Sequence, residues 1–296
     1  MIYIKINVED PNTGVSSKDV VILPETGVSA RLYLPKITHD PQSQQNKKLP
    51  LLIYFHGGGF CIETPFSPTY HNYLNSPVAE ANVVAMSIHY RRVPDHYLPV
   101  AYEDSWAALQ WVGSHSTGQG PETWLNDHAD FDRVFLAGDS AGANISHNMA
   151  VMYGQITKKL SGLKLILGVV LVHPQLWGSQ RIGSEENDIV MREKVDKFWP
   201  ILCPSSTTGN DDPRINPASD PKLLSSLGCN NVLVCVAEKD IYRDRGWLYY
   251  ETLGKSGWGG VVEIMESEGE NHMVHLLDPS SENAVELMKR LVSFLN

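Results

Sequence analysis

The run of residues 133–142, R-V-F-L-A-G-D-S-A-G, constrains the fold of this chain more than any other stretch. Residues 134–137 are apolar and predict a buried strand, and a helical pattern begins directly after the turn at 138–142. The glycines two residues before and after Ser140 allow a sharp turn, because a side chain at either place would collide with the neighbouring strand or helix. Strand, turn and helix are the setting of a nucleophilic serine, although an ordinary glycine-rich turn would also explain this run alone.

Strand and helix patterns alternate along the rest of the chain. A hairpin is expected at 20–34. Buried strands are expected at 51–55, 83–90, 165–172, 232–237 and 261–265, and helices at 99–115, 243–256 and 284–295. This alternation predicts an α/β fold with a mostly parallel central sheet and helices on both faces. We expect one domain over residues 1–296, which includes a short N-terminal segment, 1–13, in which residues 1–7 alternate like a strand.

Residues 175–226 interrupt the alternation. They are rich in Trp, Pro, Asn and Asp, and one helix is expected at 185–198. This segment contains five large apolar residues that need burial, namely Ile189, Val190, Val195, Phe198 and Trp199. We therefore expect an insertion that forms a small helical cap rather than a linker.

Composition excludes several classes of protein. The net charge is -10 and no run of Lys and Arg exceeds two residues, which argues against a nucleic-acid partner. No apolar run reaches the length of a membrane span, and the N-terminus lacks the features of a signal peptide. The four cysteines have no metal-binding spacing and are expected to be free thiols. These features favour a cytoplasmic protein without a membrane partner, and they leave the oligomeric state open.

Chemically active residues follow four of the expected strands. The run His56-Gly57-Gly58-Gly59 follows the strand at 51–55, Ser140 follows 134–137, Asp240 follows 232–237 and His272 follows 261–265. The carboxyl ends of parallel strands meet at one edge of a sheet, so these residues are expected to lie close together. The order glycine loop, Ser, Asp, His is that of the α/β-hydrolase fold.

Each of these residues has an expected role in acyl transfer. Ser140 is the candidate nucleophile, His272 the base that takes its proton, and Asp240 the carboxylate that orients the imidazole. Backbone N–H groups of Gly58, Gly59 and Ala141 are the expected oxyanion-hole donors, and Gly57 stays open as a further donor.

Two alternatives compete for the triad positions. Asp244 could replace Asp240, but it falls inside the expected helix, and His275 could replace His272, but its neighbours are apolar. Among the other polar residues near the strand ends, His56 is expected to order the glycine loop and Asp139 to form local hydrogen bonds. Glu238 is expected to be solvated. His89 and His173 end strands, where they could line the pocket.

Five motifs together resemble a known family. H-G-G-G-F at 56–60, Y-R-R-x-P at 90–94, A-Y-E-D-S-W at 101–106, L-A-G-D-S-A-G-A-N-I at 136–145 and E-K-D-x-x-R-D-R-G at 238–246 are similar to the plant carboxylesterases of the hormone-sensitive-lipase group. The resemblance implies an α/β-hydrolase with a helical cap that hydrolyses small carboxylic esters through an acyl-enzyme on Ser140. It implies no metal and no cofactor.

The family that this chain resembles includes members with two other functions. Hydroxyisoflavanone dehydratases of the family keep much of the triad and eliminate water, and the motifs do not exclude this reaction. Gibberellin receptors of the family lack the catalytic histidine, so His272 counts against a small-hormone receptor. This chain departs from the family in its short N-terminal segment, which helps to form the cap in other members, and in His89, where a carboxylate usually precedes Tyr90.

Overall fold

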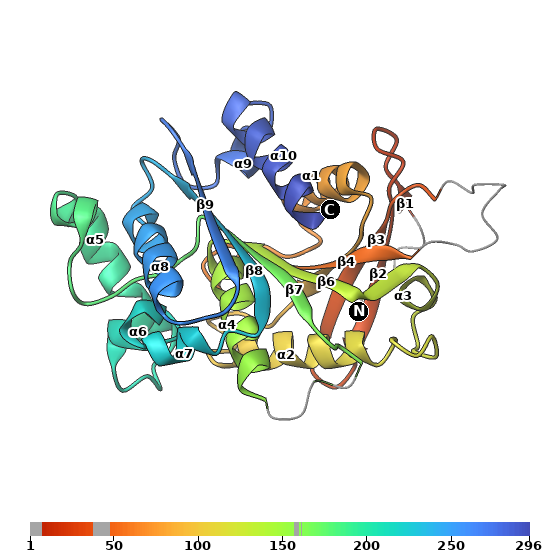
Figure 1. Ribbon diagram of the computed structural model, residues 1–296, viewed down its shortest axis with the longest axis horizontal. Helices are drawn as coiled ribbons and strands as arrows, with labels where there is room; N and C mark the ends of the chain where they lie inside the picture. The colour runs from red at the N-terminus through yellow and green to blue at the C-terminus, as the bar shows by residue number, and fades with distance from the viewer. Residues whose placement is uncertain (1–7, 38–47, 157–159, 161) are drawn as a thin grey trace.

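A twisted sheet forms the centre of the computed structural model, which describes residues 8–37, 48–156, 160 and 162–296 (Figure 1). Within these residues the sheet has nine strands in the order β1-β2-β3-β5-β4-β6-β7-β8-β9. The pairs from β1 to β5 are antiparallel, and those from β5 through β4 to β9 are parallel. The strands are β1 (Val8–Glu9), β2 (Ser16–Leu23), β3 (Val28–Leu34), β4 (Leu49–Phe55), β5 (Val84–His89), β6 (Ala129–Asp139), β7 (Ile166–Val172), β8 (Cys229–Ala237) and β9 (Val261–Ser267).

The central strands are apolar throughout because both of their faces are covered. Along β4, Leu51, Ile53 and Phe55 join one hydrophobic cluster, whereas Leu52 and Tyr54 join another on the opposite face. Helices α1 (Pro68–Ala81), α9 (Val274–Leu277) and α10 (Glu282–Leu295) pack together on the side of the second cluster (Figure 1). The first cluster is covered by α2 (Val100–Gly113), α4 (Ala141–Gln155) and α8 (Arg243–Lys255). The predicted mostly parallel sheet with helices on both faces is confirmed.

Four helices were missing from the sequence-based expectation: α1 and the short α3 (Thr123–His128), α7 (Pro221–Ser225) and α9. Helix α1 has a recognisable signal, since Ser67 and Pro68 form a typical helix start and Tyr70, Leu74 and Val78 recur on its buried face. Its interior Pro77 and the several polar residues between the apolar ones weaken that pattern.

The single helix expected at 185–198 is wrong. The chain forms a short 3-10 turn η1 (Gly183–Glu186), then α5 (Ile189–Asp196) and α6 (Phe198–Leu202). The break has a local cause: Asp188 accepts a hydrogen bond from the Met191 N–H and so starts a new helix. Further turns and one helix complete the segment, η2 (Gly209–Asp211), η3 (Pro217–Ser219) and α7 (Pro221–Ser225).

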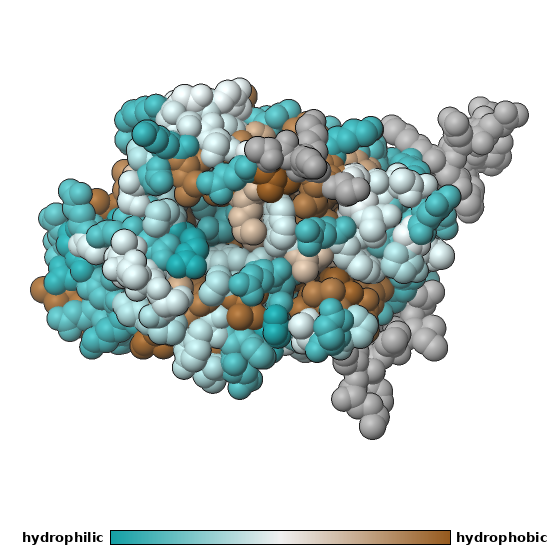
Figure 2. Space-filling model, turned by 90° about the horizontal axis from the view of Figure 1, so that it is seen from below, coloured by the Kyte–Doolittle hydropathy of each residue, from teal (hydrophilic) through white to brown (hydrophobic). Residues whose placement is uncertain are grey.

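Burial of the apolar residues in this segment is only partly as expected. Val195 and Trp199 are buried, but Ile189 is 53% exposed, Val190 68% and Phe198 36%. The reason is geometric, because α5 lies at the end of the molecule and contacts its neighbours along one side only (Figure 1). Seen from below, the surface shows separate hydrophobic patches with hydrophilic residues between them (Figure 2).

The strand expected at residues 1–7 lies outside the described residues. In the part of the chain that is described, no helix combines the length and the apolar character needed to cross a bilayer.

Candidate active site

Ser140 lies at the sharp turn between β6 and α4. Its backbone angles are φ 51° and ψ -116°, a conformation that few residues other than glycine adopt. A Cβ on Gly138 would lie 2.4 Å from the backbone of Gly142, and a Cβ on Gly142 would lie 1.9 Å from the Phe55 carbonyl oxygen. Both glycines are therefore required for close packing. The strand, turn and helix predicted from the sequence are confirmed.

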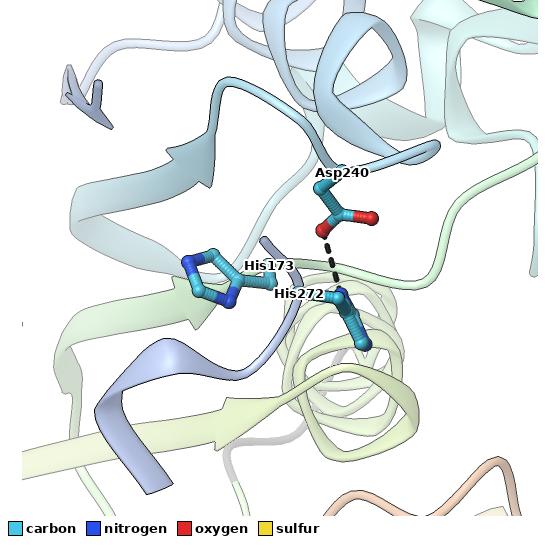
Figure 3. A group of neighbouring side chains, drawn as sticks. All are labelled: His173, Asp240 and His272. Carbon is cyan, nitrogen blue, oxygen red and sulfur yellow. Dashed lines mark hydrogen bonds and ion pairs between the residues drawn. The ribbon is translucent and has the colours of Figure 1, made fainter. Parts of the chain in front are cut away.

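The structure brings Ser140, His272 and Asp240 together from three loops. His272 Nε2 lies 3.0 Å from Ser140 Oγ. On the other side of the ring, His272 Nδ1 lies 2.6 Å from Asp240 Oδ2, the contact that is dashed in Figure 3. The Tyr242 N–H donates to the other carboxylate oxygen of Asp240 at 3.0 Å. Because Nδ1 faces a carboxylate, it carries the proton, and Nε2 is then the atom that can accept the Ser140 hydroxyl proton.

The glycine loop presents backbone amides beside this triad. Gly58 and Gly59 have φ angles of 93° and 62°, which favour glycine, and a Cβ on Gly58 would lie 2.3 Å from the Ile62 carbonyl oxygen. Among the described residues we find no acceptor for the N–H groups of Gly58, Gly59 and Ala141. The Gly57 N–H, in contrast, donates to the Tyr70 hydroxyl at 2.8 Å. This hydrogen bond removes Gly57 from the set of free donors.

A buried network behind Ser140 connects the turn to the glycine loop. Tyr54 donates to Asp139 Oδ1 at 2.6 Å, and Tyr70 donates to Asp139 Oδ2 at 2.7 Å. Burial raises the pKa of Asp139 to about 6, although both tyrosine hydroxyls oppose the shift by hydrogen bonding to the carboxylate. The expected local hydrogen-bonding role of Asp139 is confirmed. Sequence patterns gave no indication of its tyrosine partners.

The loop is also held from β5. Tyr90 donates to the His56 carbonyl oxygen at 2.7 Å and stacks on the His56 ring, with 4.3 Å between ring centroids. His56 Nδ1 lies 2.8 Å from the Gly57 carbonyl oxygen, in agreement with its expected role in ordering the loop. Burial lowers the pKa of His56 to about 3, so the ring is neutral.

The alternative triad members lie elsewhere. Asp244 belongs to α8 and accepts hydrogen bonds from the backbone and hydroxyl of Ser184 at 2.6 and 2.7 Å. His275 is 2% exposed and its ring packs against Tyr73 and His173. Glu238 is exposed and accepts from the Gly269 N–H.

His89 and His173 occupy strand ends, as expected. His89 packs its ring against Phe66, and burial lowers its pKa to about 4. His173 lies behind His272 and accepts a hydrogen bond at Nδ1 from the Met273 N–H, at 3.0 Å.

His173, Asp240 and His272 each offer a metal-ligating atom, and these atoms lie within 4.8 Å of one another. Asp240 Oδ2 and His272 Nδ1 are already bonded to each other (Figure 3). His173 Nδ1 accepts from the Met273 N–H, and its Nε2 atom has no partner among the described residues. A metal ion here would have to break these hydrogen bonds, so the contacts fit an orienting network better than a metal centre.

Two contacts fasten the segment 175–226 to the elements that carry the triad. Asn144, one turn after Ser140 in α4, donates to the carbonyl oxygens of Gln175 and Arg214 at 3.1 and 2.8 Å. Arg245 in α8 forms a buried ion pair with Glu185, and its nitrogens lie 2.5 and 2.7 Å from the two carboxylate oxygens. These contacts give a structural role to Asn144 of the motif at 136–145 and to Arg245 of the motif at 238–246.

A cavity of about 420 Å³ lies between this segment and the triad loops. Met191 and Val195 of α5 line one side, and Ile241, Tyr242 and His272 line the other. Phe198 lies close to the glycine loop, since a Cβ on Gly59 would be 3.1 Å from its ring. Polar side chains, among them Asp188, Glu238 and Lys239, complete the lining of the cavity, which reaches the triad at Asp240 and His272.

Comparison with known proteins gives a consistent result. Residues 52–276 match the family described as alpha/beta hydrolase fold. Probable carboxylesterase 13 of Arabidopsis thaliana is 48% identical over 293 residues, covering 97% of this chain and 88% of that protein. The 2-hydroxyisoflavanone dehydratase of Glycyrrhiza echinata is 44% identical over 292 residues, covering 97% of this chain and 87% of that protein.

A solved structure also resembles the chain. A thermostable carboxylesterase cloned from a metagenomic library superposes with a TM-score of 0.76 at 26% identity, covering 94% of this chain and 87% of that one. The match over most of the sequence, together with the sheet order and the turn at Ser140, shows that the chain belongs to the α/β hydrolase fold family, in the group of the plant carboxylesterases.

Proposed function

We propose that this protein is a serine carboxylesterase that hydrolyses small carboxylic esters. The observation that carries the proposal is the continuous hydrogen-bonded line from Asp240 through His272 to Ser140, with distances of 2.6 and 3.0 Å. Similarity to curated carboxylesterases over most of their length supports it.

The proposed reaction begins with attack on the ester carbonyl carbon. Ser140 Oγ forms the new bond while its proton moves to His272 Nε2, and Asp240 stabilises the resulting imidazolium. The tetrahedral intermediate then expels the alcohol, which takes the proton from His272 and leaves an acyl group on Ser140. A water molecule gives its proton to His272 and attacks the acyl carbon. The second tetrahedral intermediate then breaks its bond to Ser140 Oγ, which takes the proton back from His272, and the acid is released.

Negative charge on the former carbonyl oxygen needs hydrogen-bond donors. We assign this role to the N–H groups of Gly58, Gly59 and Ala141, which have no acceptor among the described residues. Gly57 is left out of this set because its amide is bound to Tyr70.

We further propose that the chain is one domain and that residues 175–226 act as its cap. The attachment of this segment to Asn144 and Arg245, and the apolar side chains that it places beside the cavity, support this role. The cavity of about 420 Å³ opens onto Asp240 and His272 and has the volume of a small-molecule site.

The test is turnover of a short-chain p-nitrophenyl ester. We expect a burst of p-nitrophenol followed by steady release, and a loss in kcat on the order of 10⁴-fold or more in Ser140→Ala, since removing the nucleophile removes the acyl-enzyme. Ser225→Ala is the matched control, because Ser225 is exposed on α7 and should leave activity unchanged. Equal activity in wild type and Ser140→Ala would reject the proposal.

A dehydratase is the second candidate, favoured by the relative that is named for that reaction. The same pocket would then act by acid–base chemistry on a 2-hydroxyisoflavanone. Chromatography after incubation with that compound separates the two candidates, since a dehydratase releases water to form the isoflavone whereas an esterase leaves the compound intact.

We propose a reducing compartment such as the cytosol, because the four cysteines are all free. One relative that is 49% identical is named as mitochondrial. Cell fractionation of a tagged full-length chain distinguishes the two locations.

A further inference from the structure

His173 is a buried histidine that the proposed reaction does not use. It follows β7 directly, is 1% exposed and has a φ angle of 45°, a backbone conformation that residues other than glycine rarely adopt. Such strain persists only where the surrounding structure holds a residue in place, and it is concentrated at functional sites.

His173 forms a hydrogen bond with the backbone of Met273, the residue directly after the proposed catalytic base His272. Its Nδ1 atom accepts a hydrogen bond from the Met273 N–H at 3.0 Å, and this N–H belongs to the peptide that joins His272 to Met273. Met273 is itself at φ 67°, just before α9. Two strained residues are therefore joined by one partly buried hydrogen bond, which fixes the peptide plane next to His272.

This contact also determines the protonation of His173. A nitrogen that accepts a hydrogen bond carries no proton, so the ring is the neutral tautomer with its proton on Nε2. Burial lowers the pKa of His173 well below its usual value, and the neighbouring His275 and His272 lower it further, while Asp240 opposes the shift. The neutral ring leaves the positive charge of the reaction to His272.

The three rings behind Ser140 have different relations to the triad. The His173 ring lies 5.7 Å from that of His272 and 5.4 Å from that of His275, measured between centroids. Figure 3 shows the His173 ring beside the line from Asp240 to His272 but outside it. His275 packs on His173 and hydrogen-bonds to no described residue, so it offers a matched control that shares the location but lacks the contact.

We propose that His173 is a positioning residue for His272: by accepting the Met273 N–H it holds the His272 ring between Asp240 and Ser140. The inference rests on the proposed function, because it assigns a role in placing the general base. Replacement of the acceptor should let the peptide after His272 rotate, and a displacement of the base by about 1 Å can reduce the rate by about 10²-fold.

The experiment compares two substitutions at one position. In His173→Asn the side-chain oxygen can take the place of Nδ1 and asparagine tolerates a positive φ, whereas His173→Leu has no acceptor. We expect kcat for the p-nitrophenyl ester to fall at least about tenfold in His173→Leu with KM within about twofold, and to stay within about threefold of wild type in His173→Asn. His275→Leu should also stay within about threefold.

A second measurement separates positioning from general loss of structure. The ring titration and the Nδ1 proton signal of His272, followed by NMR in the full chain, should change in His173→Leu and match wild type in His173→Asn and His275→Leu. Thermal unfolding shows whether each variant folds. If His173→Leu does not fold, His173→Gln takes its place, since its oxygen lies nearer the position of Nε2.

Three results would overturn the inference: equal kcat in His173→Leu and His173→Asn, an equal loss in His275→Leu, or an unchanged His272 signal in a folded His173→Leu. The failure of the proposed function looks different, because wild type itself would then be inactive on esters. The NMR comparison does not depend on turnover and would still test the role of His173.

Discussion

Substitution of Tyr70 by phenylalanine tests the buried network that joins the Ser140 turn to the glycine loop. Tyr70→Phe keeps the ring and removes one hydroxyl, which accepts from the Gly57 N–H at 2.8 Å and donates to Asp139 at 2.7 Å. The loss of a hydrogen bond to a charged group costs about 1.5 to 3 kcal/mol, and a buried N–H without a partner costs about 1 to 3 kcal/mol.

The two costs share one hydroxyl and will not add fully, so we expect a loss of about 3 kcal/mol in the free energy of unfolding. For a chain of 296 residues, with an unfolding entropy of about 2.1 cal/mol/K per residue, that corresponds to a decrease in Tm of roughly 5 °C. We also expect kcat for the p-nitrophenyl ester to fall at least about tenfold at unchanged KM, since the loop that carries the Gly58 and Gly59 donors loses its hydrogen bond to α1 and one such donor is worth about 10²- to 10³-fold.

Tyr73→Phe provides the matched control. Tyr73 lies one turn further along α1 and is also buried, but its hydroxyl hydrogen-bonds to no described residue. Removal of this hydroxyl should leave stability and activity near the wild-type values. Urea unfolding and steady-state kinetics of both variants check the reasoning, and similar values for Tyr70→Phe and Tyr73→Phe would refute it.

Two further predictions concern buried charge. Glu185→Gln should lower the free energy of unfolding by about 3 to 5 kcal/mol, because it leaves the buried Arg245 without its anion, and adding Arg245→Met should recover part of the loss in urea unfolding. Burial raises the pKa of Asp139 to about 6, so the stability from its neutral form is complete below about pH 4 and is lost as pH rises through about 6. Between pH 4 and pH 7 the free energy of unfolding of Asp139→Asn should therefore rise relative to that of wild type, by an amount on the order of 3 kcal/mol. Urea unfolding at several pH values measures this difference, and a difference that does not change with pH would contradict the prediction.

Several motif residues outside the triad hold the molecule together rather than act on substrate. Arg91 binds Asp104 through its backbone N–H and its guanidinium, which links Y-R-R-x-P to A-Y-E-D-S-W. Asn144 and Arg245 fasten residues 175–226 to α4 and α8. The motifs therefore contain residues that hold the site in place as well as residues proposed to act on the substrate.

Prediction from the sequence was most accurate where the pattern was local and strong. The buried strands were identified because both faces of β4, β6, β7 and β8 are covered, which produces continuous apolar runs. The segment 175–226 was predicted less well, since its helices are short and are stopped by local side chains such as Asp188. Helical periodicity cannot show such breaks, nor can it tell that Ile189 and Val190 lie at an exposed end.

The sequence by itself predicted the order in which chemically active residues follow the strands, the turn at Ser140 and the candidates Asp240 and His272. These predictions follow from residue type, spacing and the rule that parallel strands end at one edge of the sheet. Only the tertiary structure decided which amides are free and which side chains hold them. The partners of Asp139 come from β4 and α1, the partner of the Met273 N–H comes from the end of β7, and Gly57 is bound by a tyrosine from α1. Such contacts depend on distances between segments far apart in the chain, and these distances exist only after the sheet and its helices have packed together.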